Sequence, residues 1–332
     1  MMLVLMGAIV TLSLQTELVK ILQSTYDKPT FIVYCVHASF MLVLIMEYIR
    51  YLRKNHIPLA LYHLLNKNNI LEYFEDCLLI MGCSFNRVLM ISFLLVSLYN
   101  ISTLFWYWAV DYTSTNELTA IFNSGTCFAY IFSILIVNET SSIRKWSGVL
   151  VSLSGLYIIA LVGNNATGNH LYGNFLGLLG AILYGLYDTL YFKYAVPSIP
   201  SKQFSYFFTG MMGLSSCTTF WIPVLYNHLN SKEIFEIPSP SQFILLCLVI
   251  LTGVAFDTLF FQLISLTSPT IASAGILLSI PSVILCDVLF FNMVITWNMI
   301  IGSIILILGF FILHYEAFNT PYEQVDIELI NK

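Results

Sequence analysis

Residues 242–266 read QFILLCLVILTGVAFDTLFFQLISL, an apolar run that contains one charged side chain, Asp257. About 20 apolar residues let an α-helix cross a bilayer, whereas a membrane β-strand needs about 10. A helix also satisfies its own backbone hydrogen bonds in lipid, which an open strand cannot do. The run therefore predicts a membrane-spanning α-helix.

The composition extends this interpretation to the whole chain. Of the 332 residues, 58% are hydrophobic and 9% are charged, and the mean hydropathy is +0.83. A soluble domain is roughly half apolar and about a quarter charged, so a soluble globular enzyme is excluded. The net charge of -5 comes without a basic cluster, so the expected partner is the lipid bilayer and no nucleic acid.

Apolar runs separated by charged or turn residues predict ten transmembrane helices. Their approximate ranges are 1–19, 30–49, 88–110, 116–137, 146–162, 172–194, 203–226, 242–266, 271–291 and 296–315. The apolar start lacks the basic region and cleavage site of a signal peptide, so it is expected to be a true first span. The 7 cysteines lie mostly in apolar runs without metal-binding spacing, and no metal or cofactor is expected.

Positive charges in the connectors set the expected orientation, because cytosolic loops carry an excess of Lys and Arg. A cytosolic N-terminus places ten such residues on the cytosolic side: Arg50, Arg53, Lys54, Lys67, Arg87, Arg144, Lys145, Lys193, Lys202 and Lys332. It leaves three on the other side: Lys20, Lys28 and Lys232. Both termini should therefore face the cytosol.

Two connectors carry further signals. The cytosolic loop 50–87 contains a stretch, 58–82, that predicts either an amphipathic helix on the membrane surface or a partly ordered loop with apolar anchors. On the opposite side, Asn165 begins a glycosylation sequon that ends at Thr167. The sequon agrees with a lumenal position, but such short patterns arise often by chance, which favours an unoccupied site.

The two halves of the chain share an internal repeat. Gly7-Ala8-Ile9, Thr16 and Lys20 recur 173 residues later as Gly180-Ala181-Ile182, Thr189 and Lys193, and Thr113-Ser114, Gly148 and Gly155 recur 154 residues later as Thr267-Ser268, Gly302 and Gly309. With five spans per half, equivalent helices must cross in opposite directions. We predict two inverted five-helix repeats, 1–162 and 163–315, followed by a cytosolic tail, 316–332. Such repeats are typical of secondary transporters, although limited composition also makes membrane helices resemble one another.

Acidic side chains inside spans are functional candidates, because a carboxylate in lipid is costly unless it is paired or hydrated. Those within spans or at their ends are Glu17, Glu47, Asp111, Glu117, Asp188, Asp257 and Asp287. The deepest are Asp188 and Asp257, which are candidates for charge recognition or proton coupling. Glu47, Asp111 and Glu117 lie near span ends, where a solvated charge is favoured.

The neighbours of these acids suggest a ligand class. Tyr184 and Tyr191 should share one helix face with Asp188, and a carboxylate beside aromatic rings suits an organic cation. Ordinary interhelical packing or an interfacial tyrosine belt is the alternative. No Arg lies in the middle of a span, which disfavours a site for a nucleotide diphosphate.

Two other acids have both a local and a functional interpretation. Glu17 and Lys20 are three residues apart, which allows either a structural ion pair or a substrate contact. Asp287 lies six residues after Pro281, which can interrupt the helix and free carbonyl groups for a ligand. A helix kink without a ligand is the other interpretation.

Several short sequence patterns, distributed over most of the chain, resemble those of a known family. They are Glu17-Leu18 with Tyr26-Asp27-Lys28-Pro29-Thr30-Phe31, Gly177 to Ala181 with Tyr184 and Tyr187, Ser279-Ile280-Pro281 with Asp287, and His314-Tyr315. In their order and spacing they resemble the EamA-like drug/metabolite transporter superfamily, and within it solute carrier family 35, subfamily F, with its fungal vacuolar-type relatives. Span three departs from the family pattern at Thr103 and Trp106, and span four at Asn123-Ser124-Gly125, so the substrate can differ.

The resemblance implies ten helices, residence in an endomembrane, with the vacuolar membrane ahead of the Golgi, and solute transport. Thiamine-like substrates are linked to some members of the subfamily.

The leading hypothesis is a secondary transporter of a small organic solute, cationic or thiamine-like, with a homodimer as a further option. Its rivals are an exchanger of anionic metabolites or nucleotide sugars, and a scaffold or sorting receptor that has lost transport. An enzyme is disfavoured, because no catalytic motif is present and His37 and His314 stand alone, as packing residues usually do.

Overall fold

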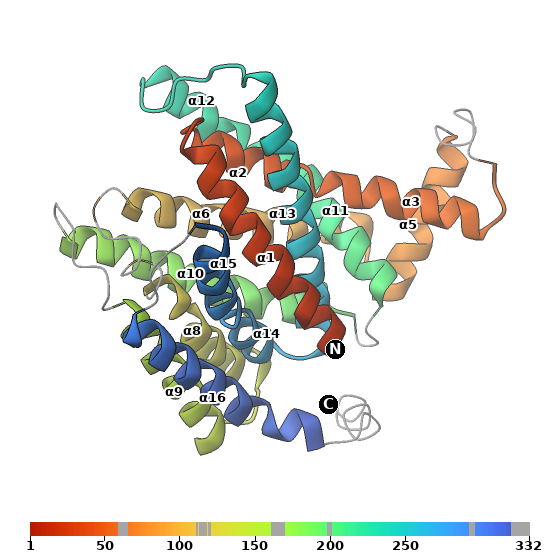
Figure 1. Cartoon of the computed structure of the whole chain (residues 1–332). Coiled ribbons are helices and arrows are strands. Elements are labelled where there is room, and N and C mark those ends of the chain that lie inside the picture. Colours follow the sequence, from red (N-terminus) through yellow and green to blue (C-terminus); the bar gives the residue numbers. More distant parts are fainter. Residues whose placement is uncertain are drawn as a thin grey trace. The chain divides into compact units, whose positions relative to one another are not determined.

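The structure is a computed structural model that describes residues 1–58, 66–110, 112, 118, 121–160, 170–197, 201–291 and 296–319. Within these ranges it leaves out the side chains of residues 107, 110, 160, 170, 287, 290, 291, 314 and 316–319. Among the described residues, all regular secondary structure is helical (Figure 1). The elements are α1 (Met2–Gln23), α2 (Pro29–Ala38), α3 (Met41–Lys54), α5 (Lys67–Met81), α6 (Phe85–Val110), α8 (Gly125–Phe132), the π-helix η1 (Ser133–Val137), α9 (Ile143–Ala160), α10 (His170–Ala195), α11 (Lys202–Thr219), α12 (Trp221–Leu229), α13 (Pro240–Leu266), α14 (Pro269–Ile276), α15 (Ser279–Phe291) and α16 (Trp297–Asn319).

Six segments of the described chain are long and apolar enough to cross a membrane. They are Met2–Gln23, Pro29–Lys54, Phe85–Trp106, Leu171–Ala195, Pro240–Leu266 and Pro269–Cys286, and shorter apolar helices cover Ile121–Val137 and Trp297–Leu313. These segments confirm an all-helical, polytopic membrane protein. Each of the ten predicted ranges overlaps a helix, but the count of ten spans stays a prediction.

The predicted spans 30–49, 203–226 and 271–291 are each broken within the apolar run, between α2 and α3, between α11 and α12, and between α14 and α15. One break separates α2 from α3 at Ser39 and Phe40, and the Ser39 hydroxyl donates to the Cys35 carbonyl at 2.6 Å. A Ser hydroxyl that donates to the backbone carbonyl four residues earlier commonly bends a helix. Another break precedes α15, whose first turn accommodates Pro281 without losing a helical hydrogen bond. The predicted interruption near Pro281 is therefore present at the start of α15.

The chain divides into two compact units. Unit 1 comprises Met1–Asn100 with Tyr191–Leu266, and unit 2 comprises Ile101–Leu190 with Thr267–Lys332. Each unit takes helices from both predicted repeats, and the division falls within α6 and α10. The boundaries of the two units differ from those of the two predicted repeats. The repeat boundaries therefore stay a prediction.

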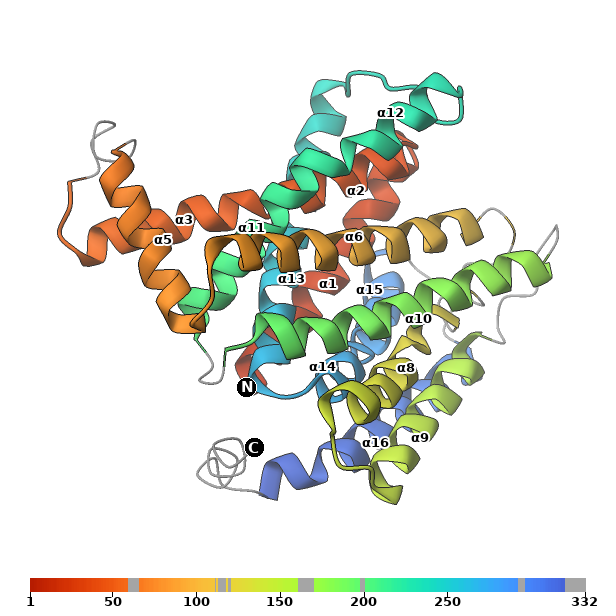
Figure 2. The ribbon, with the colours of Figure 1, turned by 180° about the vertical axis from the view of Figure 1, so that it is seen from behind.

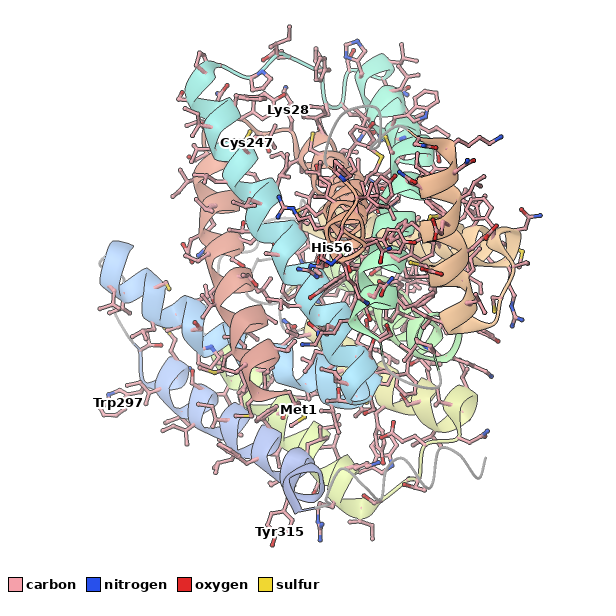
Figure 3. All side chains as sticks on the ribbon, turned by 90° about the vertical axis from the view of Figure 1, so that its right-hand side faces the viewer. Met1, Lys28, His56, Cys247, Trp297 and Tyr315 are labelled. Atoms are coloured by element: carbon pink, nitrogen blue, oxygen red, sulfur yellow. The ribbon has the colours of Figure 1, made fainter. Side chains whose placement is uncertain are left out.

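In unit 1, helices that are far apart in the sequence pack against each other. Helix α1 lies beside α13, which Cys247 marks in Figure 3, and α11 packs against α2 and α3. Gly210 and Gly213 of α11 face Leu44 and Met41 so closely that an added Cβ would clash with their backbone. These glycines explain how α11 and α3 approach each other.

In unit 2, α9 and α16 form a tight antiparallel pair, seen side by side in Figures 1 and 2. A Cβ on Gly155 would lie 2.6 Å from the Gly302 carbonyl oxygen, and one on Gly309 would lie 2.8 Å from the Gly148 carbonyl oxygen. Glycine at these positions therefore lets the two backbones touch, as small residues do in membrane helices. The four glycines of the sequence repeat therefore lie where two helices approach each other closely.

The long connector after α3 contains the helix α5. Its first turn is capped by the Asn66 side chain, and it ends at Gly82, whose φ of 63° favours glycine. Tyr73 and Cys77 are buried, and α5 packs on α3 and α11. The predicted helix exists, but its buried stripe faces the protein. Contact of exposed residues such as Leu79 with the membrane surface stays a prediction.

Candidate functional site

The structure describes most of the predicted site residues. Asp188, Tyr184 and Tyr191 lie on α10, Asp257 on α13 and Glu17 on α1. Asp287 belongs to α15, but its side chain lies outside the described structure. Asn165, Asp111, Glu117 and the tail beyond residue 319 are also outside the described residues.

Asp188 is fully buried in unit 2, inside protein rather than toward lipid. The Ser273 hydroxyl of α14 donates to Asp188 Oδ2 at 2.6 Å. The other oxygen, Oδ1, is buried and has no hydrogen-bond partner among the described residues. A buried polar atom without a partner is costly and calls for an explanation, such as a missing ligand.

The local packing of α10 explains this burial. At Gly185, an added Cβ would lie 2.6 Å from the backbone nitrogen of Ala129, so α10 approaches α8 closely one turn before Asp188. The next residue, Thr189, donates to the Gly185 carbonyl within the helix and also lies 3.3 Å from the Ala129 carbonyl oxygen. Asp188 is therefore fixed on a rigid helix face.

Ser273 can form a hydrogen bond with Asp188 Oδ2 in either protonation state of Asp188. Its hydroxyl lies 2.6 Å from Asp188 Oδ2 and 2.8 Å from the Pro269 carbonyl oxygen, but it has one proton to donate. An ionised Asp188 accepts that proton. A neutral Asp188 donates its own proton to the Ser273 oxygen, and Ser273 then donates to Pro269. The hydrogen bonding of α14 thus depends on the charge of Asp188.

The two tyrosines have aromatic partners. The Tyr184 ring lies 5.5 Å from Phe122, and the Tyr191 ring in unit 1 stacks on Phe261 at 4.9 Å. Tyr191 is fully buried, whereas Tyr184 is half-buried. These contacts favour interhelical packing for Tyr191, and a role of either ring in cation binding stays a prediction.

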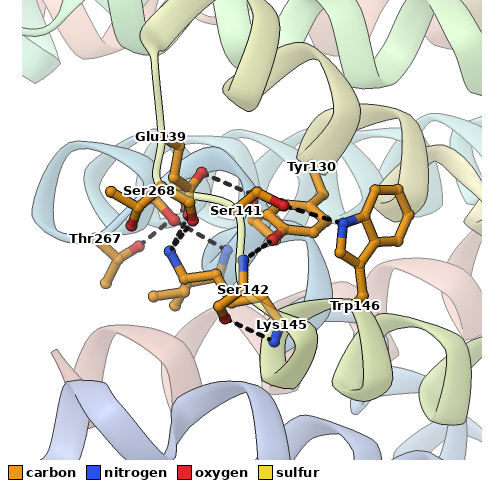
Figure 4. A network of polar contacts seen from close by, with 11 residues as sticks. Tyr130, Glu139, Ser141, Ser142, Lys145, Trp146, Thr267 and Ser268 are labelled. Atoms are coloured by element: carbon orange, nitrogen blue, oxygen red, sulfur yellow. Dashed lines mark hydrogen bonds and ion pairs between the residues drawn. The ribbon is translucent and has the colours of Figure 1, made fainter.

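A polar network that sequence reasoning missed fixes the start of α14 (Figure 4). Glu139 forms an ion pair with Lys145 at 2.8 Å and accepts a hydrogen bond from the Thr270 hydroxyl at 3.1 Å. The Ser268 side chain caps α14 by accepting from the Ile271 backbone. Because Glu139 lies in a connector 131 residues before Thr270, no local pattern reveals the contact. The network holds the helix that supplies Ser273.

We predict that replacing Glu139 by Ala destabilises unit 2. The Glu139 and Lys145 side chains are 13% and 18% exposed, so the change strands a largely buried ammonium and the Thr270 hydroxyl, at a cost of about 1–3 kcal/mol. The melting temperature of the purified protein in detergent should fall by several degrees. Glu139→Gln, which keeps an acceptor for Thr270, should lose less, and equal melting temperatures for Glu139→Ala and wild type would contradict the role.

Asp257 belongs to a second buried polar chain, in unit 1. The Tyr99 hydroxyl donates to Asp257 Oδ1 at 3.0 Å, and the Tyr99 ring stacks on His37 at 4.7 Å. His37 Nδ1 lies 2.6 Å from Asn100 Oδ1, and the Asn100 amide donates to Ser216 at 3.4 Å. The interpretation of His37 as an isolated packing residue was therefore wrong, because its polar partner lies 63 residues away. The available signal was the presence of Asn100 and Tyr99 in an apolar span.

Two acids at span ends, Glu17 and Glu47, form local ion pairs. Lys20 contacts Glu17 at 3.1 Å, and Arg50 contacts Glu47 at 2.9 Å. The local pair predicted for Glu17 is thus confirmed, although its second carboxylate oxygen is buried without a hydrogen-bond partner in the described chain. Within the described residues, no group of three His, Cys, Asp or Glu side chains is placed to hold a metal ion.

Comparisons with known proteins agree with the membrane fold. The EamA-like transporter family matches residues 171–315. A thiamine-repressible mitochondrial transport protein of Saccharomyces cerevisiae is 26% identical, over 63% of this chain and 58% of that protein. An uncharacterized vacuolar membrane protein of the same yeast is 26% identical, over 61% and 52%. Solute carrier family 35 member F5 of Macaca fascicularis is 25% identical, over 70% and 56%.

The match therefore spans between about half and two thirds of the length of these curated relatives. A solved crystal structure of another protein has a TM-score of 0.60 and 13% identity, and covers 96% of this chain and 97% of that one. At this identity the likeness shows the fold only. Residues 171–315 thus match the EamA-like transporter family, and the relatives of the chain include solute carrier family 35 member F5 and fungal transport proteins.

Proposed function

We propose that this protein is a secondary transporter that moves a small organic cation across an endomembrane by alternating access. The observation that carries the proposal is Asp188, a fully buried carboxylate with one unpartnered oxygen inside the EamA-like domain. No ion pair to Asp188 occurs among the described residues. A cationic solute supplies the charge that a buried carboxylate needs and the donor that Oδ1 lacks.

Thiamine-like solutes are the first class to test. The name of one relative refers to repression by thiamine, which identifies a regulator of that protein and not its cargo. Thiamine is nevertheless a small aromatic cation, and the half-buried Tyr184 lies one helical turn from Asp188. An aromatic ring near a carboxylate attracts such a cation through its face.

The helix pairs support the two inverted repeats on which alternating access depends. The sequence repeat equates Gly148 with Gly302 and Gly155 with Gly309. In the α9–α16 pair, Gly148 lies against Gly309 and Gly155 against Gly302. A two-fold axis that exchanges the repeats converts one of these contacts into the other. Two halves related in this way can exchange conformations of similar energy, which opens a central site to either side in turn.

The rivals from the sequence are an exchanger of anionic metabolites or nucleotide sugars and a scaffold or sorting receptor without transport. An anion exchanger needs cations at its site, and no Arg lies in the middle of a predicted span. A scaffold does not need a buried carboxylate oxygen that lacks a hydrogen-bond partner. Asp188 therefore favours the cation transporter over both.

Uptake into proteoliposomes tests the proposal. The purified protein should take up radiolabelled thiamine with saturation, and should not exchange UDP-sugars or organic phosphates. Exchange of the anions without cation uptake would replace the proposal by its first rival. Folded protein that transports neither class would support a scaffold.

The orientation and location are part of the proposal. The charge count predicts that both termini face the cytosol, and a vacuolar membrane protein among the relatives favours the vacuolar membrane over the Golgi. Tags at Met1 and Lys332 should both be digested by protease added outside sealed vacuoles, and protection of either tag would contradict the topology. The homodimer stays a prediction that light scattering of the purified protein tests.

A further inference from the structure

We propose that His37 and Asp257, with Tyr99 between them, form a proton-binding unit that couples transport to proton movement. This inference rests on the proposed function and adds the coupling ion to it. All three residues belong to unit 1, on α2, α13 and α6. His37 and Asp257 are 5% and 2% exposed, so neither can be solvated as an isolated charge.

The hydrogen bonds of Asn100 fix where His37 takes up its proton. The Asn100 amide nitrogen donates to Ser216, which leaves its Oδ1 facing His37 Nδ1 at 2.6 Å. An amide oxygen only accepts, so Nδ1 must carry a hydrogen in the neutral ring. The position that gains or loses a proton is therefore Nε2.

Tyr99 contacts both ionisable groups in a different way. Its ring stacks on the His37 imidazole with an angle of 28° between the planes, and its hydroxyl donates to Asp257. The face of a phenol ring attracts an imidazolium, and the phenol proton stabilises a carboxylate. Tyr99 therefore supports the pair when His37 is protonated and Asp257 is ionised. It also fits the state in which that proton lies on the Asp257 carboxyl group and both side chains are neutral. Release of this one proton leaves a neutral His37 and an ionised Asp257, to which Tyr99 still donates.

The elements around His37 offer few competing charges. Helix α2 packs against α11, α12 and α13, and Asp257 is the only charged residue in the sequence of α13. Other titratable or charged groups on α2, the elements packed against it, the α12–α13 connector, α6 and α1 are Tyr34, Cys35, Lys202, Tyr206, Cys217, Tyr226, His228, Lys232, Glu233, Glu236, Cys247, Arg87, Tyr107, Glu17 and Lys20. Lys202 and Arg87 lie in the first turns of α11 and α6, and Glu233 accepts from the backbone of Thr30 and Phe31 at the start of α2. Asp257 is linked to His37 through the hydrogen bond and the ring contact of Tyr99.

His37 lies where a change in its protonation can act on the helix backbone. His37 is the next-to-last residue of α2, directly before the break at Ser39 and Phe40. Its ring also lies 5.4 Å from Phe40 and 6.2 Å from Phe220, which marks the α11–α12 break. A change of charge at His37 therefore acts at two helix joints, where a backbone can bend at small cost.

Nitrogen-15 NMR of histidine-labelled protein in lipid nanodiscs tests the unit without a substrate. The chain has 6 His residues, and His37→Gln identifies the resonance of His37. We expect the neutral ring to carry its hydrogen on Nδ1. In Asp257→Asn and Tyr99→Phe, His37 should protonate less readily, by on the order of one pH unit, because the stabilising carboxylate or its link is lost. Glu75→Gln, at an exposed carboxylate on α5, is the matched control and should change nothing.

The uptake assay gives the second readout. A pH gradient should accelerate cation uptake by the wild type and by Glu75→Gln, and this acceleration should disappear in His37→Gln and Asp257→Asn. A His37 resonance that ignores Asp257→Asn, or a neutral ring protonated on Nε2, would overturn the proton-binding unit even if cation transport is found. Uptake without any effect of the gradient would do the same. If the protein transports neither solute class while His37 protonation still depends on Asp257 and Tyr99, the proposed function is wrong. The coupling role is then wrong as well.

Discussion

Replacing Asp188 by Asn should abolish cation transport, with uptake at least about 100-fold below wild type. The change keeps the shape and the hydrogen bond to Ser273 but removes the charge that pairs with the solute. Removing one partner of a buried charge pair costs about 3–5 kcal/mol, which corresponds to roughly 150- to 4000-fold in binding. The melting temperature should stay the same or rise, because an unpaired buried carboxylate destabilises the empty protein.

Two further variants separate charge from folding. Asp76→Asn makes the same chemical change at an exposed position of α5 and should leave uptake unchanged. Ser273→Ala keeps the charge and removes the donor to Oδ2, so uptake should fall less than in Asp188→Asn. Wild-type transport of a verified substrate by Asp188→Asn over about pH 5 to 8, where shifted carboxylates titrate, would show that Asp188 is structural.

Leucine at Gly155 or Gly309 should prevent unit 2 from assembling. At Gly155 the first carbon of the new side chain would already lie 2.6 Å from the Leu306 backbone nitrogen, and the rest of the side chain cannot leave the interface. Forced separation of α9 and α16 exceeds ordinary overpacking, and we expect a loss of about 3–5 kcal/mol. The measured result should be aggregation on size-exclusion chromatography or a melting temperature lowered by more than about 10 °C.

The neighbouring residue provides the control for this prediction. Ser154 precedes Gly155 on α9 and is exposed, so Ser154→Leu adds the same side chain without meeting α16. It should elute and melt like the wild type. Normal elution and melting of Gly155→Leu would contradict the close contact of the two helices.

The helical fold and its local contacts could be predicted from the sequence. Run length indicates helices because a helix satisfies its backbone groups within the segment, so no information about distant residues is needed. The ion pair of Glu17 with Lys20 follows from their separation of three residues. The spacing of the repeated glycines of α9 and α16 is also readable from the sequence, and glycines seven residues apart share one face of a helix, which allows close approach.

The tertiary structure decided which residues meet in the two polar clusters. Asp188 meets Ser273 across 85 residues, Thr270 meets Glu139 across 131, and Asp257 meets Tyr99 across 158. The hydrophobic periodicity of a helix does not indicate which face of another helix it will contact. The sequence by itself thus determined the helices, their apolar character and the depth of Asp188 and Asp257, since these depend on backbone hydrogen bonding and on the order of residues along each run. Only the packing of helices decided that Asp188 keeps one open oxygen and that His37 lies against Tyr99, because such contacts arise from surfaces that meet after the helices have formed.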